Sequence, residues 1–444
     1  MSRKMFQEFR HRRPLALLIP LLIAAVLVPI LISRCGMGRA AARPLRQPRA
    51  VVDAHAPQAP AAPSVPASAP LSMDLGRARL DGSRYVVDAA DGRTVELTLE
   101  PALQKRAEEV FRRHAVAYGG AVFVSIPDGR VLAMTGHSRA EPKRTVADLT
   151  LLPWAPAASV FKVITSAALL TAGGVDPARR VCYHGGGSRL RRENLEDRPR
   201  LDRRCGTLAE AIGSSTNSII AKLAYRHLDP ETLGAYAQAF GFNVRLQRSD
   251  AFPLEMAESP AEMPTEDLEF ARTAAGFWHV FLSPLHGARI ASAFANGGAM
   301  VAPRLVERVR DPDGTIQEPT PAPPQHAIPA AVAREVGRMM VRTTRAGTAR
   351  GAFMRGGRRA LPFDVAGKTG TLSRRRPYTH YNWFVGFAPA DNPKVAFGVL
   401  VGTSGNHVKA AAVAREVLSA ARLDASGPVT PTASSPTAVA HHEP

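Results

Sequence analysis

The hydrophobic pattern begins with a long apolar run near the N-terminus. Residues 15–33 contain no charged side chain and are rich in Leu, Ile, Ala and Val. A helix rises about 1.5 Å per residue, so this run is about long enough to cross the hydrocarbon core of a bilayer. Basic residues precede it, as in a signal anchor. We therefore expect residues 1–13 to be a cytoplasmic N-terminus and residues 14–34 to be one transmembrane helix.

Cys35 follows the apolar run and raises the alternative of a lipoprotein signal cleaved at this cysteine. Arg34 stands where such signals usually have a small residue, so the pattern favours an uncleaved anchor. Residues 35–72 are rich in Ala and Pro and are predicted to form an extended linker. Residues 424–444 are rich in Pro, Thr, Ser and Ala and are predicted to be a disordered tail. One folded unit, 73–423, remains.

Within the folded unit, the hydrophobic periods predict strands at both ends and helices between them. The pattern indicates helices at 101–114, 157–170 and 408–422. Residues 120–126 and 131–135 flank a Pro-Asp-Gly turn and predict a hairpin, while 365–367, 381–389 and 395–401 predict further strands. We expect an α+β fold, with an antiparallel sheet built from distant parts of the chain and flanked by helices.

Composition and charge narrow the classes of function. The hydrophobic fraction of 45% allows a sizeable core. The net charge of +19 comes mainly from arginines, which are scattered along the chain rather than gathered in one stripe. This distribution favours an ordinary solvated surface, and we expect no nucleic-acid partner.

The three cysteines exclude a disulfide scaffold and offer no C-x-x-C pair for a metal. Cys182 and Cys205 bracket a polar stretch rich in Gly and Arg. In an oxidising compartment they could close this loop with a disulfide. Two free thiols are an equally good interpretation of the sequence.

A serine followed by a lysine is the first candidate for chemistry. Ser159 and Lys162 are three residues apart on the predicted helix 157–170, so their side chains share one face. Apolar neighbours would lower the pKa of the amine, and neutral Lys162 could then remove the proton of Ser159. No other serine of the chain has a lysine three residues later. The alternative is a lysine that merely extends from a core helix.

A second motif places a hydroxyl and an amide two residues apart. Ser215 could relay protons, and Asn217 could orient a substrate or a lysine. Taken alone, Ser-Thr-Asn is more often a helix cap or a turn.

A third motif, Lys-Thr-Gly-Thr, follows the predicted strand 365–367. On a strand, Lys368 and Gly370 would point one way and Thr369 and Thr371 the other. A cation and hydroxyls at a sheet edge suit a peptide carboxylate, and the glycine lets another backbone approach closely. A strand end with a surface lysine is the alternative.

Together, in this order, the three motifs resemble those of the penicillin-binding proteins and serine β-lactamases. The resemblance covers nearly all of residues 84–423 and is closest to single-function, class-B-like transpeptidase domains. Five further stretches carry it: TLEPALQKRAEEVF (98–111), SVFKVIT (159–165), SPLHGARIASAFANGG (283–298), GTAR (347–350) and NWFVGFAPADNP (382–393). It implies a transpeptidase fold in which an all-helical subdomain accompanies the sheet.

The resemblance also implies a reaction. Ser159 would attack the D-Ala-D-Ala carbonyl of a peptidoglycan stem peptide, with Lys162 as its base. The acyl-enzyme would then pass the acyl group to the amine of a second stem peptide. Ser215 and Lys368 would carry the proton to the leaving D-Ala, and Asn217 would position the substrate.

The remaining implied roles concern the carboxylate and the oxyanion. Lys368 and the segment Thr369, Gly370 and Thr371 would hold the terminal carboxylate of the substrate or of a β-lactam. The backbone N–H groups of Ser159 and Thr371 would form the oxyanion hole. The resemblance calls for no metal and no organic cofactor.

Partners and location follow from the same resemblance. We expect stem peptides and β-lactams as ligands, the lipid bilayer as a contact of residues 14–34, and a glycosyltransferase or other wall-synthesis proteins as candidate partners. The catalytic domain of this single-pass protein of the inner (cell) membrane would lie on the extracytoplasmic, periplasmic side.

The sequence departs from the family pattern in two respects, and it leaves alternative functions open. The region upstream of the domain is too short for a glycosyltransferase or a full pedestal, so we expect a single-function enzyme. Thr216 stands where family members often have cysteine. The rivals are a β-lactamase of the same fold and a non-catalytic penicillin-binding sensor or scaffold. An α/β-hydrolase is disfavoured because no serine lies in a G-x-S-x-G elbow.

Overall fold

The computed structural model describes residues 71–423, apart from 188, 405–407 and 422. The expected N-terminus 1–13, anchor 14–34 and tail 424–444 lie outside the described residues, as does all of the linker but its last two residues. Within the described part, no helix is both long and apolar enough to cross a membrane.

A five-stranded antiparallel sheet forms the centre of the domain, in the order β16-β17-β18-β4-β5. Its strands are β4 (Tyr118–Ser125), β5 (Val131–His137), β16 (Ala366–Arg375), β17 (Tyr378–Ala388) and β18 (Val395–Thr403). The pair β4 and β18 joins segments more than 250 residues apart, with Phe123 opposite Phe397. The expectation of an antiparallel sheet built from distant parts of the chain is confirmed.

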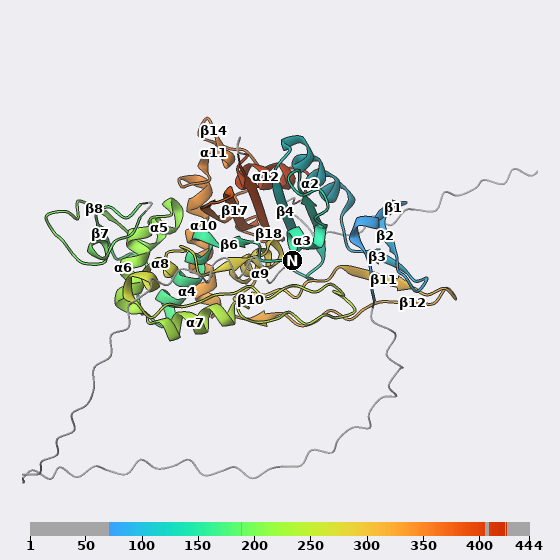
Figure 1. The fold of residues 1–444 in the computed structure, drawn as a ribbon, viewed down its shortest axis with the longest axis horizontal. Coiled ribbons are helices and arrows are strands. Elements are labelled where there is room, and N and C mark those ends of the chain that lie inside the picture. The colour runs from blue at the N-terminus through green and yellow to red at the C-terminus, as the bar shows by residue number, and fades with distance from the viewer. Residues whose placement is uncertain (1–70, 188, 405–407, 422, 424–444) are drawn as a thin grey trace, which may run out of the picture. The chain divides into compact units, whose positions relative to one another are not determined.

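Alternation along the strands gives the sheet two apolar faces. Phe123, Phe384 and Phe397 lie in the core on one face, with ring centroids of neighbouring pairs 5.4 and 5.6 Å apart. Two helices, α2 (Pro101–His114) and α12 (Ala410–Leu418), cover this face and lie together in Figure 1. The opposite face packs against α9 (Pro284–Ala295).

Helices also pack against one another beside the edge strand β16. This group consists of α4 (Lys162–Thr171), α5 (Leu208–Ser214), α6 (Asn217–His227), α7 (Pro230–Ala239), α8 (Asp267–Ala274) and α10 (Ala330–Arg345). α10 bridges the two parts of the fold because it contacts α4, α5 and β16. The edge strand that carries Lys368 therefore faces the helices that carry the other two motifs.

A second antiparallel sheet has the order β1-β2-β3-β11-β12. Its strands are β1 (Arg79–Asp81), β2 (Arg84–Asp88), β3 (Thr94–Leu97), β11 (Val306–Arg310) and β12 (Ile316–Gln317). The shorter elements are η1 (Leu75–Arg77), α3 (Val146–Thr150), β6 (Ala155–Pro156), η2 (Ala158–Phe161), β7 (Val181–Tyr183), η3 (Arg192–Asn194), β8 (Arg204–Gly206), β9 (Phe281–Leu282), β10 (Ala299–Met300), β13 (Gln325–His326), α11 (Arg350–Phe353), β14 (Met354–Arg355) and β15 (Arg358–Arg359).

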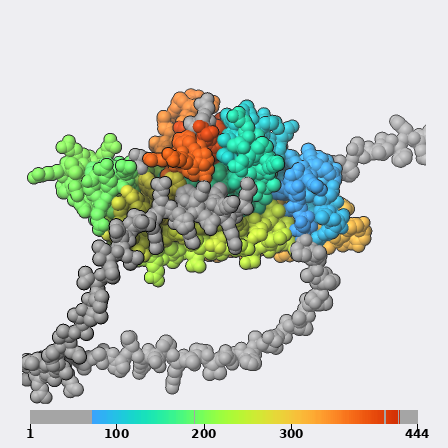
Figure 2. All heavy atoms as spheres, viewed as in Figure 1, coloured from blue at the N-terminus to red at the C-terminus, as the bar shows by residue number. Residues whose placement is uncertain are grey.

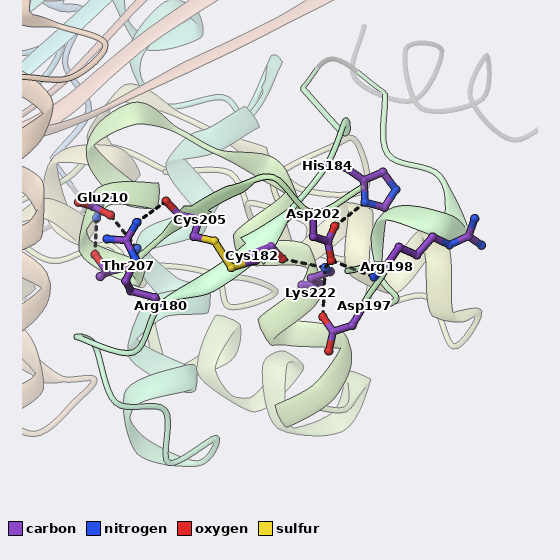
Figure 3. The surroundings of a disulfide bond; sticks show 10 residues. All are labelled: Arg180, Cys182, His184, Asp197, Arg198, Asp202, Cys205, Thr207, Glu210 and Lys222. Atoms are coloured by element: carbon purple, nitrogen blue, oxygen red, sulfur yellow. Dashed lines mark hydrogen bonds and ion pairs between the residues drawn. A yellow bond between two sulfur atoms is a disulfide. The ribbon is translucent and has the colours of Figure 1, made fainter. Parts of the chain in front are cut away.

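The strands β7 and β8 form the base of a lobe, residues 182–205, which a disulfide closes. Cys182 and Cys205 lie opposite each other in this pair and are bonded, which resolves the choice between a bridge and free thiols. Buried Lys222 of α6 holds the lobe from below: its Nζ donates to the Cys182 carbonyl and to Asp202 Oδ2, both at 2.8 Å (Figure 3). Figure 2 shows the lobe, in green, projecting from the surface.

Candidate active site

Ser159 lies in the short 3-10 turn η2, between the strand β6 and the helix α4. Its neighbour Ala158 has a φ of 50°, in the left-handed region that non-glycine residues rarely adopt. The expected regular helix from residue 157 is therefore wrong for its first turn, and α4 begins only at Lys162. The backbone of this turn is strained, and such strain persists only where surrounding contacts impose it.

Three contacts hold the turn in this conformation. The N–H of Ala157 donates to the carbonyl of Val280 at 2.9 Å. The indole Nε1 of Trp383 on β17 donates to the carbonyl of Pro156 at 2.8 Å. Gly276, at φ 83°, passes so close that a side chain there would collide with the Ala158 carbonyl. The half-buried Ser159 hydroxyl is thus fixed by the sheet on one side and by the segment after α8 on the other.

Lys162 has no exposed surface, and its amine is surrounded by oxygen atoms. Nζ lies 2.7 Å from Ser159 Oγ and 2.7 Å from Asn217 Oδ1, and it donates to the carbonyl of Ala275. Burial, followed by the charge of Lys368, holds the pKa of Lys162 well below its usual value. The site therefore favours a neutral amine.

A neutral amine has two N–H donors and one lone pair. Asn217 Oδ1 and the Ala275 carbonyl can only accept hydrogen bonds, so they take both N–H groups of neutral Lys162. The lone pair is then left for Ser159, whose hydroxyl can donate. In this geometry a neutral Lys162 would be able to accept the Ser159 proton.

Asn217 joins the lysine to the disulfide lobe. It is the first residue of α6, and its Nδ2 donates to the carbonyl of Gly187 while its Oδ1 accepts from Lys162. The next residue, Ser218, donates to the carbonyl of Gly185 at 2.8 Å. Gly185 and Gly187 of the lobe are therefore attached to the first two residues of α6.

Ser215 and Lys368 form a second pair. Ser215 caps α5 in a left-handed conformation, with φ 59°, and its Oγ accepts from Lys368 Nζ at 2.9 Å. Lys368 is completely buried, and desolvation lowers its pKa to about 7. Near neutral pH this amine can both hold and release a proton.

The other three residues of the third motif lie along the edge strand β16. Gly370 is buried against the turn of the serine, where a side chain would meet the Ala157 carbonyl at 3.1 Å. Thr369 is half-buried, and its Oγ1 lies 2.6 Å from Thr348 Oγ1. Thr371 is exposed and accepts from Asn382 at 3.2 Å.

The structure thus brings five of the eight candidate residues into two hydrogen-bonded groups, and the other three follow Lys368 on β16. One group is Ser159, Lys162 and Asn217, and the other is Lys368 with Ser215. Their coupling is electrostatic, because the charge of Lys368 lowers the pKa of Lys162. Thr369 and Thr371 lie further along β16, where their side chains pair with Thr348 and Asn382 rather than with Ser159. Within the described part of the chain, no cluster of His, Cys, Asp and Glu could hold a metal ion.

Sequence reasoning missed three polar partners of the site. The carbonyls of Ala275 and Gly187, which accept from Lys162 and Asn217, carry no signal because every residue has such a group. Thr348 lies in the GTAR stretch, which pointed to the family but to no role.

Comparison with known proteins shows which family the chain resembles. The family model "Penicillin binding protein transpeptidase domain" matches residues 119–419. Peptidoglycan D,D-transpeptidase PbpA of Mycolicibacterium smegmatis is 28% identical over 357 residues, which are 72% of this chain and 69% of the relative. An imipenem acyl-enzyme of penicillin-binding protein A from M. tuberculosis superposes with a TM-score of 0.61 at 27% identity, covering 74% of this chain and 79% of that one. The D,D-transpeptidase domain of an Eggerthella lenta peptidoglycan glycosyltransferase gives 0.60 at 25%, covering 73% and 82%.

Fold and site together define a serine enzyme in which a lysine, rather than a histidine, lies beside the serine. The chain belongs to the family of penicillin-binding protein transpeptidase domains. The family resemblance predicted from the motifs is confirmed, as is the mixed fold of sheet and helices.

Proposed function

We propose that this protein is a peptidoglycan D,D-transpeptidase that forms peptide cross-links through an acyl-enzyme on Ser159 and is acylated by β-lactams. The observation that carries the proposal is the hydrogen-bond arrangement of Lys162. Both N–H groups of its neutral amine are engaged, so its lone pair faces the Ser159 hydroxyl. The similarity to proteins named as D,D-transpeptidases supports the substrate class.

In the first step, Ser159 Oγ bonds to the carbonyl carbon of the D-Ala-D-Ala peptide bond. Its proton passes to Lys162 Nζ, and the carbonyl oxygen becomes an oxyanion. The backbone N–H groups of Ser159 and Thr371 would bind this oxyanion. Asn217 would hold Lys162 in place and position the substrate.

In the second step, the peptide C–N bond breaks and D-Ala leaves as an amine. The leaving nitrogen needs one proton, which Ser215 supplies and Lys368 replaces through their 2.9 Å hydrogen bond. The amine of a second stem peptide then attacks the ester carbon and gives up one proton, which Ser215 and Lys368 take back. The ester C–O bond breaks, Lys162 returns the proton to Ser159 Oγ, and the cross-link is formed.

The carboxylate of the substrate would bind along β16. Lys368 provides a positive charge when protonated, and the hydroxyls of Thr369 and Thr371 are hydrogen-bond donors on the same strand. Buried Gly370 keeps the strand close to the turn that carries Ser159. A β-lactam carboxylate would occupy the same place.

We also propose that residues 14–34 anchor the protein in the cell membrane, with 1–13 in the cytoplasm, 35–72 as a linker, 73–423 as the transpeptidase domain outside the membrane and 424–444 as a tail. The apolar run supports the anchor. The disulfide between Cys182 and Cys205 suits an oxidising compartment. A glycosyltransferase is a fitting partner, since cross-linking acts on strands that such an enzyme supplies.

The test is to incubate full-length protein with a synthetic stem peptide ending in D-Ala-D-Ala and with a peptide that offers an acceptor amine. We expect mass spectrometry to detect a cross-linked product and one released D-Ala per cross-link. Ser159→Ala should yield neither.

Other outcomes would contradict the proposal in distinct ways. Release of D-Ala with only hydrolysed peptide would indicate a carboxypeptidase. Rapid multiple turnover of nitrocefin would indicate a β-lactamase. Absence of any reaction with peptide or β-lactam would indicate a sensor or scaffold.

A further inference from the structure

Thr348 lies in a loop that connects two parts of the site. The loop follows α10, and the backbone N–H of Thr348 donates to the carbonyl of Gly213 at 3.1 Å, two residues before Ser215. Its side chain reaches the other way, with Oγ1 2.6 Å from Thr369 Oγ1. Gly347 makes this approach possible, since a side chain there would collide with the Gly213 carbonyl. Thr348 therefore joins the helix end that carries Ser215 to the strand that carries Lys368.

The end of α10 also binds the two residues that precede this strand. Thr344 Oγ1 donates to the carbonyl of Val365 at 2.6 Å. Arg345 Nε donates to Asp364 Oδ1 at 3.0 Å. These contacts precede Lys368 and involve no hydroxyl of the third motif. Thr348 differs because its partner is a side chain that the proposed function assigns to the substrate carboxylate.

Two hydroxyls 2.6 Å apart share one hydrogen between their oxygens, and the second hydrogen points elsewhere. If Thr369 donates to Thr348, the Thr369 hydrogen is not available to bind the substrate carboxylate. If Thr348 donates to Thr369, the Thr369 hydrogen is free to bind an anion. An anion beside Thr369 favours the second arrangement, because each hydrogen in the chain then points towards the negative charge and each bond strengthens the next.

We propose that Thr348 is a positioning residue for the substrate carboxylate: it donates to Thr369 and thereby directs the Thr369 hydroxyl towards that carboxylate. This inference rests on the proposed function of the site. It adds a residue that acts through Thr369 and contacts neither Ser159 nor either catalytic lysine.

The test compares second-order acylation rates of the full-length protein by benzylpenicillin and by its carboxyl methyl ester. For Thr348→Val we expect the rate with benzylpenicillin to fall about three- to tenfold, the range of one hydrogen bond. The rate with the ester should stay within about twofold of wild type, because the ester lacks the anion that orders the hydroxyls. Thr348→Ser keeps the donor and should restore the rate with benzylpenicillin.

Two further comparisons test whether Thr348 orients the Thr369 hydroxyl or only stabilises β16. Thr344→Val removes the hydrogen bond to Val365, the residue before β16, and leaves Thr369 unchanged, so it should slow the acid and the ester alike. In a Thr369→Val background, Thr348→Val should have no further effect, because the hydroxyl it positions is gone.

Equal loss for acid and ester in Thr348→Val, or an unchanged effect in the Thr369→Val background, would overturn the inference. So would wild-type acylation by benzylpenicillin in Thr348→Val. Failure of the proposed function is a different result: the wild-type protein would then not be acylated by benzylpenicillin at all.

Discussion

At the scale of single residues, the proposed site depends on two buried amines with different roles. Burial, followed by the nearby charge of Lys368, holds the pKa of Lys162 well below its usual value, which favours the neutral amine that a base needs. Lys368 has a pKa of about 7, so near neutrality it can be a cation for a carboxylate and a proton source for a leaving amine. Because the two charges interact, their titrations are coupled and belong to the pair.

This difference predicts a bell-shaped pH dependence for the second-order rate of acylation by benzylpenicillin. At low pH, Lys162 becomes protonated and cannot accept the Ser159 proton, so the rate falls. Above about 7, Lys368 loses its proton and its charge, so the rate falls again. Stopped-flow acylation across the pH range measures both limbs, which report groups of the free enzyme.

Lys368→Arg is the control for the alkaline limb. Arginine stays protonated throughout this range, so its rate should be lower but should no longer fall above about 7. An alkaline limb that persists unchanged in Lys368→Arg would assign it to another group.

The sequence predicted the side chains of the site but not their backbone partners. Ser159, Lys162, Ser215, Asn217 and Lys368 carry functional groups in short motifs, and the structure places them in hydrogen-bond contact. The Ala275 and Gly187 carbonyls complete the arrangement. Backbone groups are the same at every position, so only the fold selects which of them meet a buried amine.

At the scale of elements, local patterns predicted the regular segments well. The structure contains the predicted helix at 101–114, the predicted hairpin, which is β4 and β5, and the three predicted C-terminal strands, which are β16, β17 and β18. The second sheet was not predicted. Its strand β3 pairs with β11, more than 200 residues later, and its strands are only two to five residues long. Short strands with distant partners leave little periodicity in the sequence.

The strained turn at Ser159 was also unpredicted, and it gives a prediction about Gly276. Gly276→Ala would push a methyl group against the Ala158 carbonyl and within 3.0 Å of the Ser159 Cα. We expect acylation by benzylpenicillin to slow about 100-fold, the scale of a misplaced reacting group. A time course of covalent labelling measures this rate.

Gly174→Ala is the matched control. Gly174 also has a positive φ, of 56°, but a side chain there would meet nothing within 4 Å. Both variants carry the left-handed cost of about 1–2 kcal/mol, so both should lower the melting temperature. Only Gly276→Ala should lose acylation. A similar loss in Gly174→Ala would show that general destabilisation, rather than the position of Ser159, is responsible.

At the scale of the whole molecule, the site exists because three distant segments meet. The serine turn, the end of α5 with the start of α6, and the edge strand β16 come from residues near 159, 215 and 368. α10 contacts all three regions through α4, α5 and β16 (Figure 1). Motif order and spacing predicted that these segments act together. Their meeting depends on β18 pairing with β4, which no local pattern specifies.

The disulfide lobe belongs to the same scale. The sequence alone did not decide whether Cys182 and Cys205 are bonded or free, because it does not show whether two cysteines lie opposite each other. The pairing of β7 with β8 places them together, and Lys222 of α6 binds the Cys182 carbonyl (Figure 3). Ser218 and Asn217, on the same helix, bind the carbonyls of Gly185 and Gly187. The lobe thereby adjoins the candidate site at Asn217, although its residues lie outside all three motifs.

The central claim is that Ser159 becomes covalently acylated. The most direct measurement is the intact mass of the full-length protein after incubation with benzylpenicillin, beside Ser159→Ala with an unchanged melting temperature. Our account predicts that the wild type gains the mass of one drug molecule, mapped to the peptide that contains Ser159, and that Ser159→Ala gains none. An adduct on both proteins, or on neither, would contradict it.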